Sequence, residues 1–362
     1  APYLGLFLES EGFGLFEIAQ LSSLLMLTKI IAPVLWGTLA DRYQNRVALV
    51  RIGALMTMLF YLCFFFAERY WQYAMIIVLF SFFWNAALPQ FEAATLFHLK
   101  EQPHRYSKIR LWGSVGFIIA VLCIGWFIDI LTIDYLPEMI IVLLGMIWLV
   151  SLVTPETKAS KKNETTVGVF KIIKQPEIIA FFFVYMLLQL AHGPYYVFYS
   201  IYLNQFNYTS TIIGLLWALG VCAEVILFVF MKQILGWFSL RFILLMSILL
   251  SICRWLIIAF YVESLPLMLF AQVLHAATFG SSHIVAIHLV HKYFGDHHQG
   301  KGQALYSSLS FGLGGMIGSL GSGYFWDIYG AWFVYSMAAA CCFIALIIAY
   351  LWVGRENHKV LS

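Results

Sequence analysis

The hydrophobic positions of this chain form long apolar stretches that recur from one end of the sequence to the other. Most stretches have about 20 residues, the length that a helix needs to cross about 30 Å of hydrocarbon. Short segments with most of the charged residues separate them. The pattern therefore predicts an all-α membrane protein with twelve transmembrane helices. The predicted spans are 1–10, 17–39, 46–67, 71–99, 106–128, 136–153, 177–203, 209–232, 241–261, 265–291, 300–325 and 331–353.

A polar connection divides these spans into two sets of six. Residues 154–168 (TPETKASKKNETTVG) hold five charged residues and no aromatic residue, a composition typical of a solvated linker. Equal halves around a linker are typical of duplicated transporters, whose substrate site lies between the halves. We predict a six-helix bundle over 1–153, a cytoplasmic linker over 154–176, a second six-helix bundle over 177–353 and a cytoplasmic tail over 354–362.

The first span is shorter than the others. Its residues 1–10 give about 15 Å of helix, half of the hydrocarbon thickness. We therefore expect that the sequence begins inside the first helix.

The composition argues against a soluble protein, and the sequence lacks the features of an enzyme or a receptor. Of the 362 residues, 62% are hydrophobic and 11% are charged, whereas a soluble domain has roughly 25% charged residues. An enzyme or receptor would need a soluble module or a set of nucleophile, base and metal ligands, and the sequence shows neither. We therefore expect a protein in the lipid bilayer that is not an enzyme and has no cofactor and no nucleic-acid partner.

The distribution of cations predicts the orientation. All Lys and Arg residues except Lys29, Arg69, Arg110 and Arg254 lie in or beside alternate loops, and the opposite loops are mainly acidic. Because cation-rich loops stay in the cytoplasm, we predict that both termini are cytoplasmic. Three of the four exceptions, all but Arg69, lie inside predicted spans.

Several patterns have a structural interpretation. The six cysteines show no CxxC spacing and are expected to pack as small apolar residues. The stretch HKYFGDHH, 291–298, lies in a basic loop without a further ligand cluster, so we expect no metal site. Gly314 and Gly318 have the small-xxx-small spacing that favours close helix packing.

Ionisable residues from different spans are predicted to meet near the middle of the bilayer. At a rise of 1.5 Å per residue, Glu92 and Glu224 each lie about 12 Å from the cytoplasmic ends of their spans. Around a wet cavity such groups can neutralise one another, so we expect a functional or charge-pairing role for both. Arg110 could instead reach the lipid headgroups, and His275 could be a packing residue.

The seventh span carries an aromatic face. His192, Tyr195, Tyr196 and Tyr199 follow the spacing i, i+3, i+4 and i+7, which places them on one side of a helix. Such a face suits a cavity for a ring-bearing ligand, although it could equally be a seam between helices.

The loop GTLADRYQNR, residues 37–46, resembles the loop signature G-x-L-A-D-R-x-x-x-R of the major facilitator superfamily. The resemblance implies the fold of that superfamily. Gly37 would allow close helix contact, and Asp41 could pair with Arg42, Arg46 or a helix N-terminus as a cytoplasmic gate. The matching loop of the second half, LGWFSLRF, keeps only Gly236 and a cation.

Longer motifs resemble the phenylpropionate permease family of bacterial inner-membrane transporters. They are SKIRLWGSVGF (107–117), HGPYYVFYSIYL (192–203), GLLWALGVCAEVILF (214–228) and LHAATFGSSH (274–283). The resemblance runs from the first span to the last. It implies a proton-coupled permease in the inner membrane with a small organic substrate.

A more distant similarity is to lactose permease and related proton symporters. Glu92 and Arg110 match the substrate-binding Glu and Arg of the fourth and fifth spans in that family. Glu224, Arg254 and His275 match its Glu, Arg and His in spans eight to ten. The family's proton-carrying Glu, one turn after that His, is replaced here by Thr278, so proton coupling would have moved to Glu92, Glu224 or a histidine, or would differ.

These residues suggest how substrate and proton binding could be linked. In the substrate-free state we expect Arg110 to pair with Glu92, so that neither charge is alone in low dielectric. A substrate carboxylate could take over the guanidinium through two hydrogen bonds, and the displaced Glu92 would then take up a proton. Substrate and proton binding would thereby be linked, as symport requires.

We therefore predict a monomeric secondary active transporter that works by alternating access. It would use the proton gradient to carry a small organic substrate such as an aromatic carboxylate, for example 3-phenylpropionate. A sugar or nucleoside proton symporter, with Trp112 or Trp217 stacked on the ring, and a proton-driven multidrug exporter are the alternatives. The candidate substrate-binding residues are Arg110, Glu92, Lys29, Arg254, His192, Tyr196 and Trp217. The candidate proton-coupling residues are Glu92, Glu224, His275 and His283.

Overall fold

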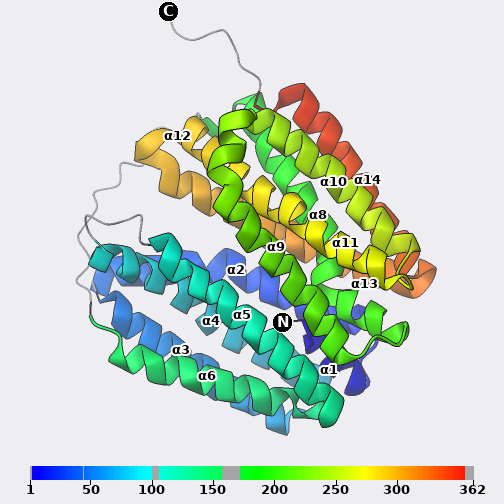
Figure 1. Ribbon diagram of the computed structural model, residues 1–362. Helices are drawn as coiled ribbons and strands as arrows, with labels where there is room; N and C mark the ends of the chain where they lie inside the picture. The colour runs from blue at the N-terminus through cyan, green and yellow to red at the C-terminus, as the bar shows by residue number, and fades with distance from the viewer. Residues whose placement is uncertain (1, 44, 100–105, 157–171, 355–362) are drawn as a thin grey trace, which may run out of the picture.

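The computed structural model describes residues 2–43, 45–99, 106–156 and 172–354, in which every regular element is helical (Figure 1). The N-terminal group contains α1 (Leu4–Ser10), α2 (Leu15–Tyr43), α3 (Arg46–Leu62), η1 (Cys63–Phe66), α4 (Tyr70–Leu99), α5 (Tyr106–Ile130), η3 (Ile133–Tyr135) and α6 (Leu136–Val153). The C-terminal group contains α8 (Pro176–Gln205), α9 (Ser210–Trp237), α10 (Leu240–Phe260), α11 (Leu265–His275), η4 (Ala276–Ser281), α12 (Ser282–Ser307), η5 (Ser308–Gly314), α13 (Gly315–Tyr329) and α14 (Ala331–Trp352). Most of the predicted linker, 157–171, and most of the predicted tail, 355–362, lie outside the described residues.

Each predicted span coincides with a helical segment, and the described residues contain ten helices long and apolar enough to cross a membrane. The prediction of a multi-pass helical membrane protein is therefore confirmed. The element labelled α12 is broken at Gly295, whose φ of 59° favours glycine, and a second helical run continues from there through η5 into α13. The prediction had separated two spans at this place. Both η4 and η5 are π-helical turns inside longer helices.

The two groups touch mainly where α5 packs against α9 and α2 packs against η5 and α13, and α8 makes smaller contacts with α1 and α2. Within the N-terminal group α4 packs on α2 and α3, and within the C-terminal group α8 packs on α13 and α14. The predicted close packing at Gly314 and Gly318 is confirmed, because a Cβ on either would collide with the backbone of α8. Helix α8 is the most buried of the candidate spans.

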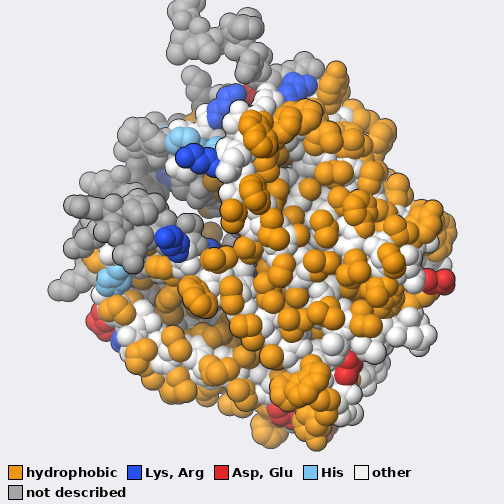
Figure 2. Space-filling view, in the orientation of Figure 1, with side chains coloured by type: hydrophobic (Ala, Val, Ile, Leu, Met, Phe, Trp, Pro, Cys, Tyr) orange, Lys and Arg blue, Asp and Glu red, His pale blue; other side chains and the backbone are white. Residues whose placement is uncertain are grey.

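The ends of the helices differ in charge, as Figure 2 shows. We call the end that carries Arg42, Lys108 and Lys232 the basic end, and the end that carries Asp129 and Glu263 the acidic end. Hydrophobic side chains cover most of the surface between them (Figure 2). Such an apolar band between two polar ends fits a lipid bilayer.

At the acidic end, the acidic-end contact (Tyr3, Val121, Asp129, Ser210 and Thr211) joins the two groups. The Asp129 carboxylate accepts hydrogen bonds from the backbone N–H groups of Ser210, at 2.7 Å, and Thr211, at 2.8 Å. The Tyr3 hydroxyl lies 3.0 Å from the Val121 carbonyl and 3.1 Å from the Ser210 carbonyl. An acid at the first turn of α9 also interacts favourably with the positive end of the helix dipole.

Toward the basic end the same helices lose contact. Val34 and Leu35 on α2 are 61% and 53% exposed, and Trp112 on α5 is 73% exposed. The structure is therefore closed at the acidic end and separates toward the basic end.

Candidate substrate-binding cavity

A cavity of about 420 Å³ lies between the two groups of helices, within the usual range for small-molecule sites. The N-terminal group lines it from α1, α2 and α5, and the C-terminal group lines it from α8, α9, α11, η4, η5 and α13. Its walls are mainly apolar and aromatic. Among the described residues that line it, Lys29 and Glu224 carry charge and His275 can gain one.

Lys29 provides a cation in the middle of the membrane. It lies on α2, equally far from both ends of that helix, and its side chain is exposed toward the cavity. It makes no ion pair or hydrogen bond with any residue of the described chain. Because an unpaired charge at this depth is costly, a site for an anion beside Lys29 is chemically reasonable.

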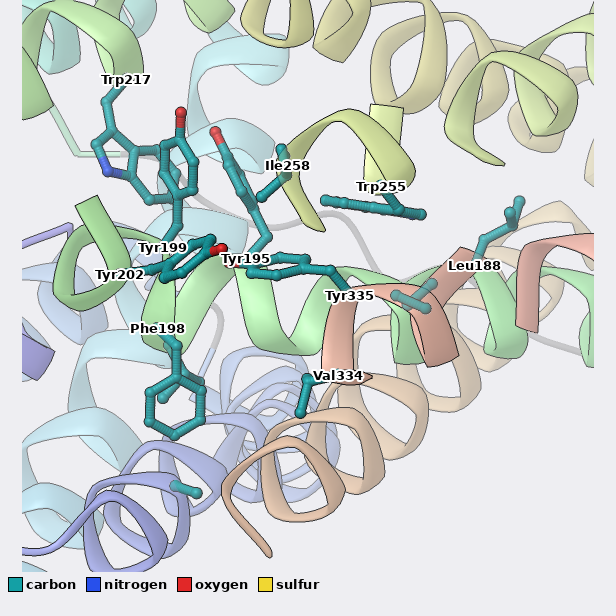
Figure 3. Packing of buried hydrophobic residues seen from close by; sticks show 14 of the residues in the cluster. Leu188, Tyr195, Phe198, Tyr199, Tyr202, Trp217, Trp255, Ile258, Val334 and Tyr335 are labelled. Carbon is teal, nitrogen blue, oxygen red and sulfur yellow. The ribbon is translucent and has the colours of Figure 1, made fainter. Parts of the chain in front are cut away.

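An aromatic wall faces Lys29 from the C-terminal group. Tyr195 and Tyr196 of α8 and Trp217 of α9 line the cavity, and the rings of Tyr195 and Trp217 lie 4.5 Å apart (Figure 3). The Trp217 Nε1 donates a hydrogen bond to the Ser200 Oγ at 3.0 Å, which fixes the indole ring. Tyr199, from the same predicted face, is fully buried. The face therefore forms part of the cavity wall and part of the packing between helices, and binding of a ring-bearing ligand there stays a prediction.

Glu224 and His275 contribute the remaining ionisable groups of the cavity. Glu224 follows Trp217 by two turns of α9, about 10 Å nearer the basic end. The positive charge of Arg110 is close enough to interact with Glu224 and with His283. His283, predicted to take part in proton coupling, does not line the cavity, and its Nδ1 lies 3.0 Å from the Tyr306 hydroxyl.

The expected pair of Arg110 and Glu92 is present. The Arg110 Nε lies 3.6 Å from the Glu92 Oε1, and the two side chains are 54% and 36% exposed. Gly113 makes room for the guanidinium, because a Cβ there would lie 2.8 Å from Arg110 Nη1. Neither charge lines the cavity. Phe117, which does, lies two turns deeper on α5, about 10 Å away along the helix.

Arg254 and His192, predicted to bind substrate, lie behind the aromatic wall. Arg254 is 0% exposed, its Nε donates to the Ala271 carbonyl at 3.0 Å, and its Cζ lies 4.4 Å from the centre of the Tyr195 ring. His192 is 1% exposed, and its Nδ1 lies 2.7 Å from the Leu188 carbonyl. The prediction of direct substrate contact is therefore wrong for this conformation, because Tyr195 forms the wall and Arg254 packs behind it.

The predicted gate residues are only partly assembled. The expectation of a close helix contact at Gly37 is wrong here, because a Cβ at this position would meet no atom within 4 Å. Arg42 is exposed, and Arg46 Nη1 donates to Gln90 Oε1 at 2.8 Å. The side chain of Asp41 lies outside the described residues, as do those of Asp296 and His297 in the stretch considered for metal binding.

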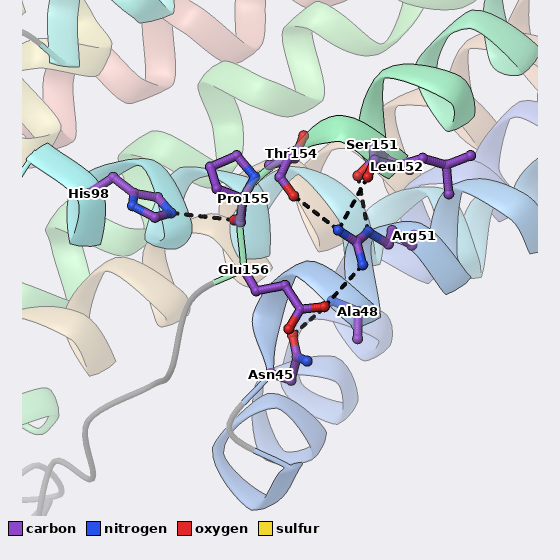
Figure 4. Close-up of polar contacts among 9 residues, drawn as sticks. All are labelled: Asn45, Ala48, Arg51, His98, Ser151, Leu152, Thr154, Pro155 and Glu156. Atoms are coloured by element: carbon purple, nitrogen blue, oxygen red, sulfur yellow. Dashed lines mark hydrogen bonds and ion pairs between the residues drawn. The ribbon is translucent and has the colours of Figure 1, made fainter.

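At the same end of the molecule, Arg51 connects α3 to the end of α6 through several hydrogen bonds. The sequence did not indicate this contact. The Arg51 guanidinium donates to the carbonyls of Ser151, Leu152 and Thr154 and pairs with Glu156 at 3.1 Å (Figure 4). It thereby caps the last carbonyls of α6. The first residues of the linker are held against α3 through this contact.

Several residues that line the cavity were not predicted from the sequence. Phe117, Phe279 and Phe311 line the cavity, but an apolar residue facing a cavity has the same sequence pattern as one facing lipid. Gln189 also lines it and lies two turns before Tyr196 on α8. A polar residue inside an apolar span was a signal that could have identified Gln189.

Two groups of helices around a central cavity with ionisable residues define a membrane transporter. Residues 1–337 match the MFS_1 like family, so the chain belongs to this family of the major facilitator superfamily, whose members are transporters and not enzymes. The family prediction from the loop motif is thereby confirmed.

Two relatives are similar to the chain in sequence, and one solved protein is similar to it in fold. The chain is 29% identical over 339 residues to the "Probable 3-phenylpropionic acid transporter" of Escherichia coli (strain K12), covering 90% of this chain and 88% of that protein. It is 24% identical to the "Maltose permease" of Geobacillus stearothermophilus, covering 98% of this chain and 91% of that protein. Two crystal structures of the nucleoside transporter NupG, one of a mutant, share the fold with TM-scores of 0.86 and 0.85, at 16% and 17% identity, over 97% of this chain and 94% of NupG.

Proposed function

We propose that this transporter takes up a small ring-bearing monocarboxylate together with protons. The observation that carries the proposal is the cavity between the two groups, in which the unpaired Lys29 faces the aromatic wall of Tyr196 and Trp217. A cation suits a carboxylate, and aromatic rings suit an apolar ring. The relative named as a probable 3-phenylpropionic acid transporter supports an acid of this kind.

The architecture that goes with this function is twelve transmembrane helices in two six-helix bundles. In this proposal the protein is a monomer of the inner membrane with both termini in the cytoplasm, because the cations gather at the basic end. The described conformation is then open toward the cytoplasm, and alternation with an outward-open conformation carries the substrate across. The proton gradient supplies the energy, and no cofactor takes part.

Ionisable groups for proton coupling are present along the path from the basic end. Arg110 and Glu92 form an exposed pair there, and Glu224 and His275 follow in the cavity. Substrate and proton binding are linked if a carboxylate on the substrate competes with a protein carboxylate for a shared cation.

A sugar or nucleoside symporter is the second candidate, favoured by the hydrogen-bonding Gln189 and Ser22 in the cavity and by the indole of Trp217. Sugar and nucleoside rings stack on such aromatic surfaces, and their hydroxyl groups form hydrogen bonds with such polar side chains. The relative named maltose permease supports this candidate.

Proteoliposomes loaded with a pH-sensitive dye test the proposal. We expect internal acidification when 3-phenylpropionate is added outside, beyond that of protein-free liposomes, which report passive entry of the protonated acid. Maltose and nucleosides should give no signal. A response to maltose or a nucleoside alone would replace the substrate class, and silence with all three would favour a proton-driven exporter.

A further inference from the structure

We propose that Lys29 binds the substrate carboxylate and that Glu224 takes up the balancing proton, so that one proton accompanies each monocarboxylate and transport is electroneutral. This inference rests on the proposed function and adds the residue that takes up the proton, the choice of Lys29 over Arg110 as the anchor, and the stoichiometry. It begins with the two charged residues that line the cavity, one contributed by each group of helices.

The charge balance of the cavity limits what it can hold. Among the described lining residues, Lys29 and Glu224 together sum to zero when His275 is neutral. A bound monocarboxylate adds one negative charge, and a net charge in a low-dielectric site is costly. One proton on Glu224 restores neutrality. A dicarboxylate would need a second proton, so the cavity favours monoanions.

Arg110 is a poorer anchor than Lys29. It already pairs with Glu92, so a substrate at Arg110 would leave that carboxylate without its partner. Its guanidinium is half exposed, and solvent weakens the attraction of an exposed charge for a ligand. Lys29 is also exposed, but it has no carboxylate partner among the described residues, and it lines the cavity that holds the aromatic wall.

The surroundings of Glu224 suit a group that gains and loses a proton. Arg110 from α5 is a cation that acts on Glu224, and Lys29 from α2, His275 from α11 and Tyr196 from α8 line the same cavity. When the substrate carboxylate occupies Lys29, it neutralises that cation, and the ionised Glu224 leaves the cavity with a net negative charge. Its protonation therefore accompanies substrate binding and is reversed on release.

Lys29→Gln and Lys232→Gln form a matched pair for the anchor. Lys232 is an exposed cation at the basic end and serves as the control. In purified protein in proteoliposomes, exchange of labelled 3-phenylpropionate should fall about 10- to 100-fold in Lys29→Gln, the loss expected for a hydrogen bond between charged groups. Lys29→Arg should restore part of it. Arg110→Gln should lower exchange less than Lys29→Gln does.

A neutral analogue keeps the test independent of expression and folding. The wild-type protein should prefer 3-phenylpropionate to 3-phenylpropionamide in competition, and Lys29→Gln should lose this preference. A retained preference in Lys29→Gln, together with its loss in Arg110→Gln, would overturn the assignment of the anchor while leaving the proposed function intact.

Imposed gradients test the stoichiometry. Wild-type uptake should follow a pH gradient and ignore a potassium diffusion potential set with valinomycin. Glu224→Gln, which mimics the protonated side chain, should lose accumulation driven by the pH gradient and respond to an inside-positive potential. Wild-type uptake that responds to the potential would overturn electroneutral transport. Absence of any carboxylate transport by the wild-type protein would instead refute the proposed function.

Discussion

Asp129 is expected to stabilise the conformation closed at the acidic end. Its carboxylate receives two backbone hydrogen bonds from the first turn of α9, at 2.7 and 2.8 Å, across the boundary between the two groups. Asp129→Asn keeps an acceptor oxygen but removes the charge. When the acidic end opens, these groups separate and water replaces the partners, so the substitution acts on one conformation more than on the other.

The size of the effect follows from the contacts. A hydrogen bond to a charged group contributes about 1.5–3 kcal/mol, and an acid at a helix N-terminus about 0.3–1 kcal/mol. Asp129 is exposed, which lowers both values. We expect a shift of about 1–2 kcal/mol, which changes the ratio of the two conformations about 5- to 30-fold. The variant should favour the conformation open at the acidic end.

Distance measurements between spin labels can detect this shift. Labels at Leu131→Cys and Gln205→Cys, in a protein without its native cysteines, report the separation of the two groups of helices at the acidic end. Asp129→Asn should increase the population of long distances. Asp134→Asn is the control, because Asp134 lies at the same end and accepts only from nearby Thr132. Unchanged distances in Asp129→Asn, or an equal change in the control, would refute the reasoning.

Three further substitutions follow from close contacts. Gly113→Ala should displace the guanidinium of Arg110, because the new Cβ would lie 2.8 Å from it, and should lower substrate transport several-fold in proteoliposomes. Gly318→Ala should lower the melting temperature in detergent, because its Cβ would collide with the backbone carbonyl of Leu190. Arg51→Gln should also lower the melting temperature, since about 1–3 kcal/mol is lost when buried or charged hydrogen-bond partners are left unpaired.

Controls for these substitutions lie in the same helices. Gly116→Ala and Gly321→Ala introduce a Cβ with no atom within 4 Å and should leave transport and melting temperature near the wild-type values. Equal effects at both members of a glycine pair would mean that helix flexibility, and not the close contact, decides the result. For Arg51, the comparison variant is Arg51→Lys. Unlike Arg51→Gln, it keeps a positive charge for the ion pair with Glu156, but it loses most of the hydrogen bonds to the carbonyls.

The sequence predicted the helices well because their signal is local. An apolar stretch of membrane length needs no partner to be recognised, and the intramembrane charges Lys29, Glu92, Arg110 and Glu224 were identified by their cost in hydrocarbon. The pairing of Arg110 with Glu92 was expected from their similarity to the Glu and Arg of lactose permease and from the cost of a lone charge in low dielectric.

What the sequence could not provide is the rotation of each helix. Arg254 and Lys29 are both cations inside spans, yet one is fully buried behind a wall and the other faces the cavity. The difference depends on which neighbours pack against each face, and that is a property of the assembled groups. The same reason explains why Phe117 and Phe279 were missed and why Gly37 was expected to pack.

The π-helical turns η4 and η5 lie beside the cavity, at positions where a helix can bend. Phe279 belongs to η4 and Phe311 to η5, and their rings meet at 6.1 Å on the cavity wall. A π-helical turn is a common place for a helix to bend, and such turns are frequent at functional sites. The C-terminal wall can therefore change its width by bending two helices in their middle, so the size of ligand that fits the cavity depends on backbone bending as well as on side chains.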